Sequence, residues 1–367
     1  MPAGLSPFSV LGKGGACLVG LLSFALLSPR AGALPTQPVP ATLDQLAQAC
    51  QAAVAQGKPT ARLRAYYPEI RLTVVSHDKI DSRLSFGHVA HPGTYATTVT
   101  RPDLFRNYLI QQLTLLMDNH AVPVQIGLSD TPIPLHFAVA GNPDLSVPHQ
   151  GELDFTLRDV FDVPDLSTTN DDIVNGQRSH NADGSQPLAP FTAQRVDYSL
   201  SRLSHYTATD PIHFQNYVLF TNYQFYVDEF EFMARAALSK PSLGYTAFVA
   251  GGNATITTGD GVLTPSAKTP QMPTYHLTTP FGQGVTLANI GVGPSNAKTM
   301  TDHLAVLRPH AWLMVGHCGG LRQSQQIGDY VLAHGYLRED GILDSVVPTE
   351  MPIPALAEVQ VALQEAA

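Results

Sequence analysis

Two glycine-rich turns carry the residues best suited to chemistry. Residues 291–296 read GVGPSN and residues 316–320 read GHCGG, and each turn follows a short apolar run. Glycine lets the backbone come close to a ligand, and the N–H groups of a helix that begins after Gly293 attract an anion or sugar hydroxyls. The second turn adds His317, a titratable side chain among small residues. Together these turns predict a small-molecule site.

A third turn, FTNY at residues 220–223, also follows an apolar run and contains Asn222. Ligands of α/β sheets bind at the carboxyl ends of the strands, so we expect the three turns to converge on one edge of a sheet. Each signal alone has an equally good structural explanation. GVGP lacks the GxGxxG spacing and serves as well for a tight packing turn. His317 fits a hydrogen-bonded core histidine, Cys318 is more often a small buried hydrophobe than a nucleophile, and the sequence has no GxSxG elbow.

The elements that position these turns alternate between strands and helices after residue 211. Short apolar runs that end in small residues predict buried strands of a largely parallel sheet. These runs read YVLFTNY, YTAFVAGG, VTLANIGVG, AWLMVG and DYVLAHGYL. A hairpin is predicted near residues 280–284, and residues 295–307 form an amphipathic helix that Pro309 terminates. Its predicted buried face consists of Ala297, Met300, Leu304 and Leu307. The pattern is that of an α/β domain.

The first half of the chain has a different pattern. Helical spacing of apolar residues predicts a helix at 42–56, and β-branched or alternating residues predict strands at 69–75 and 95–100. A proline begins the helix predicted at 102–117. We therefore expect an α+β N-terminal domain. The polar, Gly- and Asn-rich residues 167–190 predict an exposed loop close to the domain boundary.

Composition limits the classes of function. A chain of 367 residues, 44% hydrophobic and 14% charged, has the profile of a globular protein with two domains. Its net charge of −9, with no run of Lys or Arg, argues against a nucleic-acid partner. The three cysteines form neither a CxxC pair nor a His/Cys cluster at zinc spacing, so no structural metal is predicted.

The start of the chain resembles a secretory leader. An apolar run at residues 16–27 follows Lys13, and Ala-Gly-Ala at residues 31–33 resembles a signal-peptidase site. Residues 13–33 thus make export one alternative. The run is too short to cross a bilayer as a helix, and we predict no membrane partner. The lack of a disulfide pattern favours the cytoplasm.

Several segments carry a family resemblance. Residues 289–334, from NIGVGPSN through MVGHCGG to IGDYVLAH, resemble the nucleoside phosphorylase and nucleosidase superfamily. Residues 91–116 (HPGTYATTVTRPDLFRNYLIQQLTLL), 195–207 (RVDYSLSRLSHYT) and 220–230 (FTNYQFYVDEF) resemble the AMP nucleosidases within it, over about residues 41–367 in all. This resemblance implies a leader or upstream extension at 1–40 and a regulatory α+β domain at 41–205. An incomplete three-layer α/β nucleoside-phosphorylase-like catalytic domain follows at 206–367.

The resemblance implies hydrolysis of AMP to adenine and ribose 5-phosphate through a transition state with oxocarbenium character on the ribose. Such a site must stabilise a cationic sugar, a departing purine and an attacking water. By position, the resemblance assigns His317 to orienting the water or the ribose. The other implied substrate-binding residues are Cys318 and Gly319 at the purine, Gly291, Gly293 and Ser295 at the sugar, and Asn222 at the nucleophile pocket. Asp329 is expected to fix a turn.

The sequence departs from the family pattern in three places. Met314 stands where phosphorylases carry the Arg that grips phosphate, so water is the more plausible nucleophile. The family's basic residue near Tyr226 is missing, which leaves recognition of the 5′-phosphate unexplained. The family's general acid belongs to a Ser-Asp segment that these 367 residues do not match, so we expect little activity from this chain by itself. Asp340, Asp344 and Glu350 are the alternative acids.

The resemblance also implies effectors. Arg101 and Arg106 begin the helix after the Thr-rich strand, where they would bind a regulatory phosphate or ATP; ordinary surface arginines are an equally good explanation. No cofactor is required for the chemistry, Mg-ATP is an implied activator, and a homo-oligomer is expected for the complete protein. Two other functions remain open: a phosphorolytic transferase, which would make a pentose 1-phosphate, and a nucleotide-binding chain that binds AMP without releasing adenine.

Overall fold

The computed structural model describes residues 8–11, 65–75, 87–89, 91–134, 137, 165, 167, 169–264, 266, 270–338, 341, 344 and 347–367. Contacts between Cα atoms divide the chain into unit 1, Met1–Ser201, and unit 2, Arg202–Ala367. Helix α6, Ala193–Thr207, contains this division and also the boundary expected between residues 205 and 206. The helix predicted at 42–56 and the leader-like residues 13–33 lie outside the described residues.

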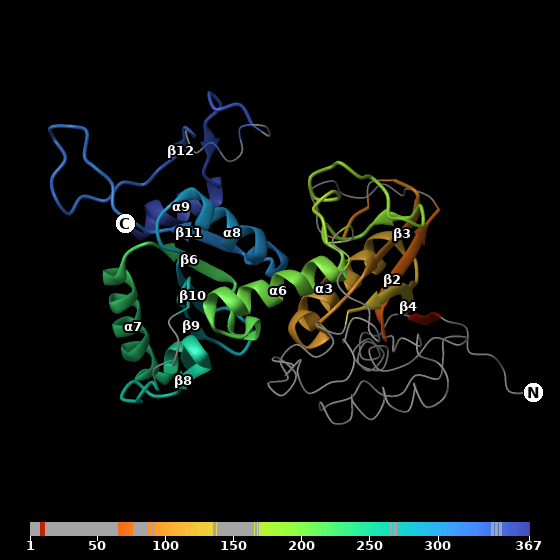
Figure 1. The fold of residues 1–367 in the computed structure, drawn as a ribbon, viewed down its shortest axis with the longest axis horizontal. Helices are drawn as coiled ribbons and strands as arrows, with labels where there is room; N and C mark the ends of the chain where they lie inside the picture. Colours follow the sequence, from red (N-terminus) through yellow and green to blue (C-terminus); the bar gives the residue numbers. More distant parts are fainter. Residues whose placement is uncertain are drawn as a thin grey trace, which may run out of the picture. The chain divides into compact units, whose positions relative to one another are not determined.

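Unit 1 is built on a five-stranded sheet in the order β1-β4-β2-β3-β5 (Figure 1). The strands are β1 Phe8–Leu11, β2 Ala65–Val74, β3 Gly93–Thr98, β4 Val124–Ile133 and β5 Gln186–Pro187. Helix α3, Pro102–His120, packs on the sheet, because Leu113 and Leu116 join the sheet residues Ile70, Leu72 and Ile126 in one buried cluster. The predicted strands at 69–75 and 95–100 and the helix that begins at Pro102 are confirmed.

The polar segment before α6 is mostly irregular, as predicted, but it is not simply an exposed loop. Its residues bond one another and the sheet: Asn181 donates to the carbonyl of Ala96 at 3.1 Å, and the Ser185 hydroxyl donates to Asp183 at 2.6 Å. Strand β5 pairs in parallel with β3, and Ser185 is buried. Residues 174–180 and 182–184 are exposed, as predicted, and side-chain hydrogen bonds hold the segment where apolar burial does not.

Unit 2 contains a six-stranded sheet in the order β11-β6-β10-β9-β7-β8. Its strands are β6 Tyr217–Thr221, β7 Ala247–Ala250, β8 Ala254–Ile256, β9 Thr274–Thr278, β10 Val285–Asn289 and β11 Ala311–Met314. The helices between them are α7 Gln224–Leu238 and α8 Pro294–Leu304, with 3-10 turns at Pro211–His213, Pro241–Leu243, Gly251–Asn253 and Ala305–Leu307. The predicted hairpin is the connection between β9 and β10.

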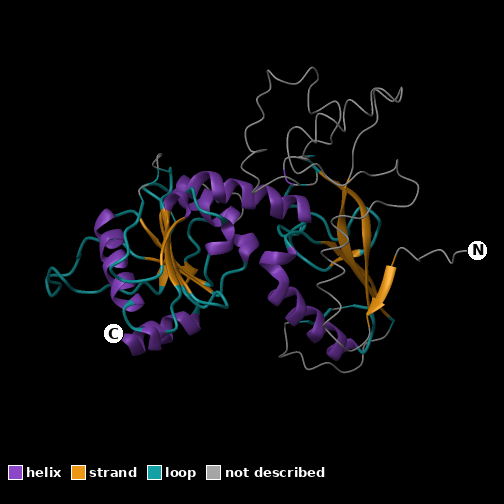
Figure 2. Cartoon of the chain, turned by 90° about the horizontal axis from the view of Figure 1, so that it is seen from below, coloured by secondary structure: helices purple, strands orange, loops and turns teal. Residues whose placement is uncertain are grey.

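Helices cover both faces of this sheet, which gives three α/β/α layers (Figure 2). Alternating strand residues divide between the faces, as the pleat requires. On one face Leu287 and Phe248 pack with Phe230 of α7. On the other face Phe220 packs with Met300, a residue of α8. Met300 and Leu304 of the predicted α8 face are fully buried in this second cluster, with Ala297 and Leu307 packed against it, so that prediction is confirmed.

The direction of the strands in unit 2 agrees with the prediction, but one predicted strand is absent. Strands β11, β6, β10 and β7 run in one direction, as expected for a largely parallel sheet, whereas β9 and β8 run in the opposite direction. The apolar run around Tyr330 is not a buried strand, because Tyr330 is 99% exposed and only β12, Gly335–Tyr336, is extended. That short strand pairs with β13, Ile353–Pro354, outside the main sheet, and helix α9, Ala357–Ala366, follows it. An apolar run alone does not reveal whether a partner strand is available.

Candidate functional site

Three strand ends of unit 2 meet at one edge of the sheet. Strands β10 and β11 flank β6 and run parallel to it, so Asn289 is paired with Thr221 and Met314 with Phe220. Two backbone hydrogen bonds extend this register beyond the strands. The N–H of Ile290 donates to Thr221 at 2.8 Å, and the N–H of Val315 donates to Phe220 at 2.8 Å. The three glycine- or asparagine-bearing turns therefore begin side by side, as the sequence predicted.

The turn after β10 contains two glycines whose backbone has positive φ angles. Gly291 has φ 66° and Gly293 has φ 111°, a region that side chains disfavour. Gly293 is the N-cap of α8 and has no side-chain cap, and Pro294 occupies the first helical position. The exposed Ser295 and the next residue thus present first-turn N–H groups that have no acceptor within the helix. This geometry suits an anion or a hydroxyl oxygen.

The turn after β11 places His317 among aromatic rings. The ring centroids of His317 and Tyr223 are 4.5 Å apart in an edge-to-face arrangement, and Tyr226 lies 5.3 Å from His317. Asn222 reaches the same turn, since its Oδ1 would be 3.9 Å from a Cβ at Gly316. His317 is exposed, which is not the environment of a core histidine.

Sequence reasoning chose Asn222 from this loop and missed the two tyrosines. Tyr223 and Tyr226 are three residues apart at the start of α7, which places them on one helical face. That spacing was the available signal. Cys318 and Gly319 are both exposed, so Cys318 is not a small buried hydrophobe, and Asp329 accepts from the N–H of Gln326 at 2.8 Å and so fixes a turn.

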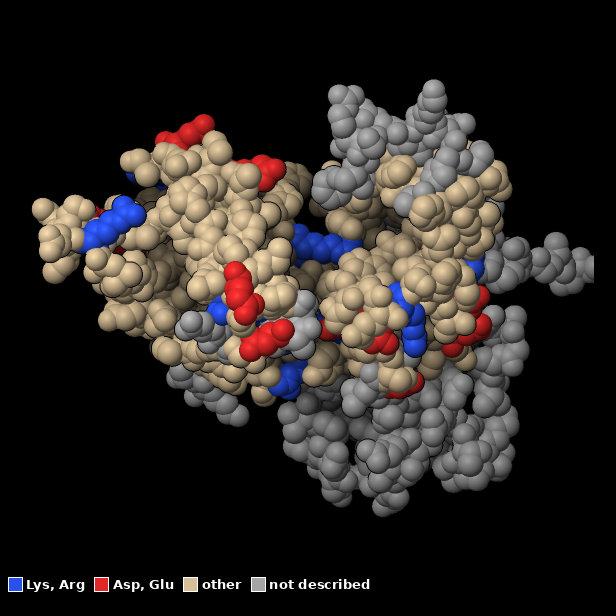
Figure 3. Space-filling view, turned by 90° about the horizontal axis from the view of Figure 1, so that it is seen from above, with Lys and Arg blue, Asp and Glu red and all other residues tan. Residues whose placement is uncertain are grey.

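Other predicted residues stand apart from this edge. Asp344 and Glu350 are exposed, and Asp340 lies outside the described residues. Within the residues that the structure describes, no group of three or more His, Cys, Asp or Glu side chains gathers as metal ligands. On the face shown in Figure 3, Lys and Arg lie in small separate groups among uncharged and acidic residues.

In unit 1, Arg101 and Arg106 are the predicted phosphate-binding residues. The guanidinium of Arg101 is paired with the carboxylate of Asp103, with Nη2–Oδ2 at 2.8 Å and Nε–Oδ1 at 3.0 Å. Arg106 is exposed on α3. An anion at Arg101 would compete with Asp103, and the assignment of both arginines stays a prediction.

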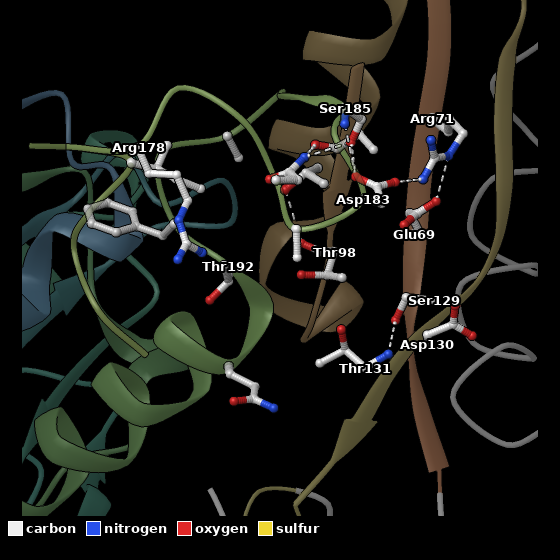
Figure 4. Close-up of a pocket in the computed structure, with 18 of the residues that line it drawn as sticks. Glu69, Arg71, Thr98, Ser129, Asp130, Thr131, Arg178, Asp183, Ser185 and Thr192 are labelled. Atoms are coloured by element: carbon white, nitrogen blue, oxygen red, sulfur yellow. Dashed lines mark hydrogen bonds and ion pairs between the residues drawn. The ribbon is translucent and has the colours of Figure 1, made fainter. Parts of the chain in front are cut away.

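A cavity of about 510 Å³ with several polar side chains in its lining lies within unit 1 (Figure 4). Its walls come from β2, β3, β4 and the segment before α6. The side chains include the ion-paired Arg71, the exposed Arg178 and the hydroxyls of Ser129 and Thr131. The sequence did not predict this cavity, because its residues lie on four separate segments with no common motif.

A buried carboxylate connects the start of α6 to the sheet of unit 1. Asp197 accepts hydrogen bonds at 2.7 Å from Tyr67 and from Thr100. Burial raises the pKa of Asp197 to about 6, although these two hydrogen bonds lower it. Burial and the neighbouring carboxylate also raise the pKa of Tyr67. This cluster is an anchor between β2, α6 and the start of α3.

Comparisons with known proteins agree with the order of the two units. Residues 40–185 match the family model described as "Bacterial AMP nucleoside phosphorylase N-terminus", and residues 255–367 match "Phosphorylase superfamily". The second unit is thus a phosphorylase-superfamily domain. The chain is also 47% identical over 287 residues to the AMP nucleosidases of Escherichia coli strain K12 and Escherichia coli O157:H7. Over these 287 residues the chain is thus similar to the AMP nucleosidases.

The match covers 77% of this chain, and the chain spans 58% of the length of these relatives. Among solved structures, the AMP nucleosidase of Bacteroides thetaiotaomicron VPI-5482 is 27% identical, with 47% of this chain and 61% of that chain covered and a TM-score of 0.36. Purine nucleoside phosphorylase from Toxoplasma gondii is 16% identical, with 44% and 56% covered and a TM-score of 0.33. No helix among the described residues is long and apolar enough to cross a membrane.

Proposed function

We propose that this protein hydrolyses the N-glycosidic bond of AMP to give adenine and ribose 5-phosphate. The two family-model matches and the identity to two named AMP nucleosidases support the reaction. The observation that carries the proposal is the convergence of three strand ends beside the open N-terminus of α8. A sugar with developing positive charge and an attacking water would meet backbone N–H groups and an imidazole there.

Each group at this edge has a distinct role in the proposal. The first-turn N–H groups of α8, including that of Ser295, take ribose hydroxyls or an anionic oxygen. His317, in contact with Tyr223, orients the water or a ribose hydroxyl. Met314 supplies no positive charge for a phosphate nucleophile, which favours water. Holding the water and the ribose in a reactive geometry increases the rate of hydrolysis.

We also propose that the protein acts in the cytoplasm and assembles as a homo-oligomer. The proposal also includes phosphate or ATP as effectors, with Mg-ATP as an activator and no cofactor in the chemistry. These statements rest on the family resemblance and on the three cysteines without a disulfide pattern.

The test measures AMP binding by calorimetry and the products formed from AMP by chromatography, with an Escherichia coli AMP nucleosidase as positive control. We expect saturable AMP binding, and we expect His317→Ala to weaken it about tenfold. Any release of adenine from AMP should not require inorganic phosphate in the assay. The matched control is His310→Ala, an exposed histidine at the opposite end of β11, which should leave AMP affinity unchanged. Adenine release that requires phosphate and yields a pentose 1-phosphate would contradict hydrolysis. Absence of AMP binding would contradict the site.

A further inference from the structure

The cavity of unit 1 is separate in sequence from every residue assigned to the AMP site. Its volume of about 510 Å³ lies within the range of small-molecule sites. One wall is the sheet, through Glu69 and Arg71 of β2 and through residues 128–131 of β4. The other wall is formed by residues between Ser167 and Gln194. Both walls belong to unit 1, so the cavity is formed within a single unit.

One side of the cavity has its charges already paired. Arg71 donates to Glu69 at 2.8 Å and also pairs with Asp183, which accepts a further bond from the Ser185 hydroxyl. Partial burial raises the pKa of Asp183, but the hydrogen bonds and charge of Arg71 and the bonds from Ser185 outweigh it and lower the pKa to about 2. This side is therefore fixed in position. It offers directional donors and acceptors without a net positive charge.

The opposite side carries Arg178. Figure 4 shows Arg178 across the cavity from Arg71. The backbone N–H of Arg178 is fixed by the carbonyl of Asp172 at 3.0 Å, while its exposed guanidinium has no acceptor among the residues that the structure describes. A guanidinium with five N–H donors in this position is suited to a carboxylate or a phosphate.

A row of hydroxyl groups lies between these two sides. Figure 4 shows Thr98, Ser129, Thr131 and Thr192 in this middle region. The hydroxyl of Ser129 accepts from the N–H of Thr131 at 3.1 Å, and that of Thr98 accepts from the N–H of Ala193 at 3.0 Å. The hydroxyls of Ser129 and Thr98 accept in these two bonds, so each still has a hydrogen that it can donate to a ligand. Ser129 is buried, so a ligand oxygen at this position would meet a donor out of bulk water.

We propose that this cavity binds a small phosphorylated sugar, with its phosphate at Arg178 and its hydroxyls along Thr131 and Ser129 toward the Glu69–Arg71 pair. The lining distinguishes this class from others. A bare inorganic anion would also face the carboxylates of Glu69 and Asp183. A polyanion would carry more charge than Arg178 can pair, and among the described lining residues Arg178 is the one guanidinium without an acceptor. An apolar molecule would cover buried hydroxyls without bonding them, which is unfavourable.

The experiment measures binding of ribose 5-phosphate to the 367-residue chain by calorimetry, with ribose and inorganic phosphate as separate probes. We expect ribose 5-phosphate to bind at least about tenfold more tightly than either probe, because both ends of the cavity contribute. Arg178→Gln should weaken this binding about tenfold or more, since it removes a charge-assisted hydrogen bond. Thr131→Val should weaken it severalfold, because it removes one hydroxyl and keeps the shape of the side chain.

Two controls separate this cavity from other sites. Arg322→Gln removes an exposed arginine outside the cavity and should keep the affinity for ribose 5-phosphate. His317→Ala reports on binding at the proposed AMP site, whose reaction product is the same sugar phosphate. Equal affinity in wild type and Arg178→Gln would overturn the proposal. So would binding of inorganic phosphate as tight as that of ribose 5-phosphate. Loss of binding in His317→Ala with retention in Arg178→Gln would assign the ligand to unit 2 instead.

Discussion

The cavity of unit 1 and the strand ends of unit 2 present polar groups in opposite ways. In the cavity the polar groups belong to side chains, and an ion-paired cluster of Glu69, Arg71 and Asp183 fixes their positions. At the strand ends the polar groups belong to the backbone of a glycine turn and to exposed rings such as Tyr223. The core of the sheet supports these turns. The first arrangement depends on charge pairing across distant segments. The second depends on strand register and on the sheet core beneath it.

This difference determines which substitutions should matter in each unit. Loss of a core side chain in unit 2 should disturb the strand ends, because they have few contacts of their own. In unit 1, changes of charge should matter more, because the ion-paired Asp183 and the buried Asp197 anchor the segments around the cavity. The predictions below test this contrast, beginning with the largest expected effect.

The largest effect is expected for Phe248→Ala in the core of unit 2. Phe248 is fully buried on β7 and packs with Phe230 of α7. Truncation of a buried phenylalanine costs about 3–5 kcal/mol of the free energy of unfolding. Urea unfolding followed by the fluorescence of the single tryptophan, Trp312 on β11, reports on this unit.

Phe225→Ala is the matched control, because Phe225 is 61% exposed in the first turn of α7, beside the strand ends. Its truncation should change the free energy of unfolding by less than about 0.5 kcal/mol. Equal destabilisation by the two alanine variants would show that the strand ends do not depend on the buried sheet as argued.

The second effect is a pH dependence from Asp197 in unit 1. Its pKa in the folded state is about 6, above its ordinary value of 3.8. The carboxyl therefore contributes stability that is fully present below about pH 4 and is lost as the pH rises through 6. The loss amounts to about 3 kcal/mol. Since Asn cannot ionise, the free energy of unfolding of Asp197→Asn relative to wild type should rise by about this amount between pH 4 and 7.

Asp183→Asn provides the control with the opposite sign. The lowered pKa of Asp183, about 2, gives stability that is present above its ordinary value of 3.8 and is lost as the pH falls through 2. Between pH 4 and 7 this variant should differ from wild type by a constant amount in urea unfolding followed by circular dichroism. A constant difference for Asp197→Asn as well would mean that Asp197 does not titrate in this range.

A smaller effect is expected at the strand ends, where Tyr223 contacts His317 edge to face. An aromatic contact of this type contributes about 0.5–1.5 kcal/mol. If this contact positions the imidazole, Tyr223→Ala should weaken AMP binding about threefold to tenfold, while Tyr223→Phe should retain it. Calorimetry on both variants provides the measurement. Equal losses in the two would assign the effect to the tyrosine hydroxyl and not to the ring.

The sequence predicted features that depend on neighbouring residues. Apolar runs located β6, β10 and β11, and the spacing of small residues located the turns at their ends, because both signals are local. Strands β9 and β8 were not among the predicted runs, and they add antiparallel pairs to the sheet. The cavity was missed because Glu69, Ser129 and Arg178 come together only in the folded unit.

The smallest effect is expected for Arg101→Gly. Arg101 is a non-glycine residue with φ 45°, so glycine removes backbone strain of up to about 1 kcal/mol. Glycine also removes the partly exposed ion pair with Asp103, which contributes about 0–1 kcal/mol. The two changes oppose each other, and the free energy of unfolding should stay within about 1 kcal/mol of the wild-type value.

Arg101→Ala separates the two contributions, because alanine loses the ion pair and keeps the left-handed backbone. It should therefore be less stable than Arg101→Gly in urea unfolding. The same alanine variant, combined with Arg106→Ala, tests the predicted regulatory site, since a phosphate held by these arginines would bind more weakly. If both phosphate and ATP affinity are unchanged, the two residues are ordinary helix-surface arginines. Anion recognition in unit 1 would then rest with the cavity at Arg178, where the guanidinium has no acceptor among the described residues.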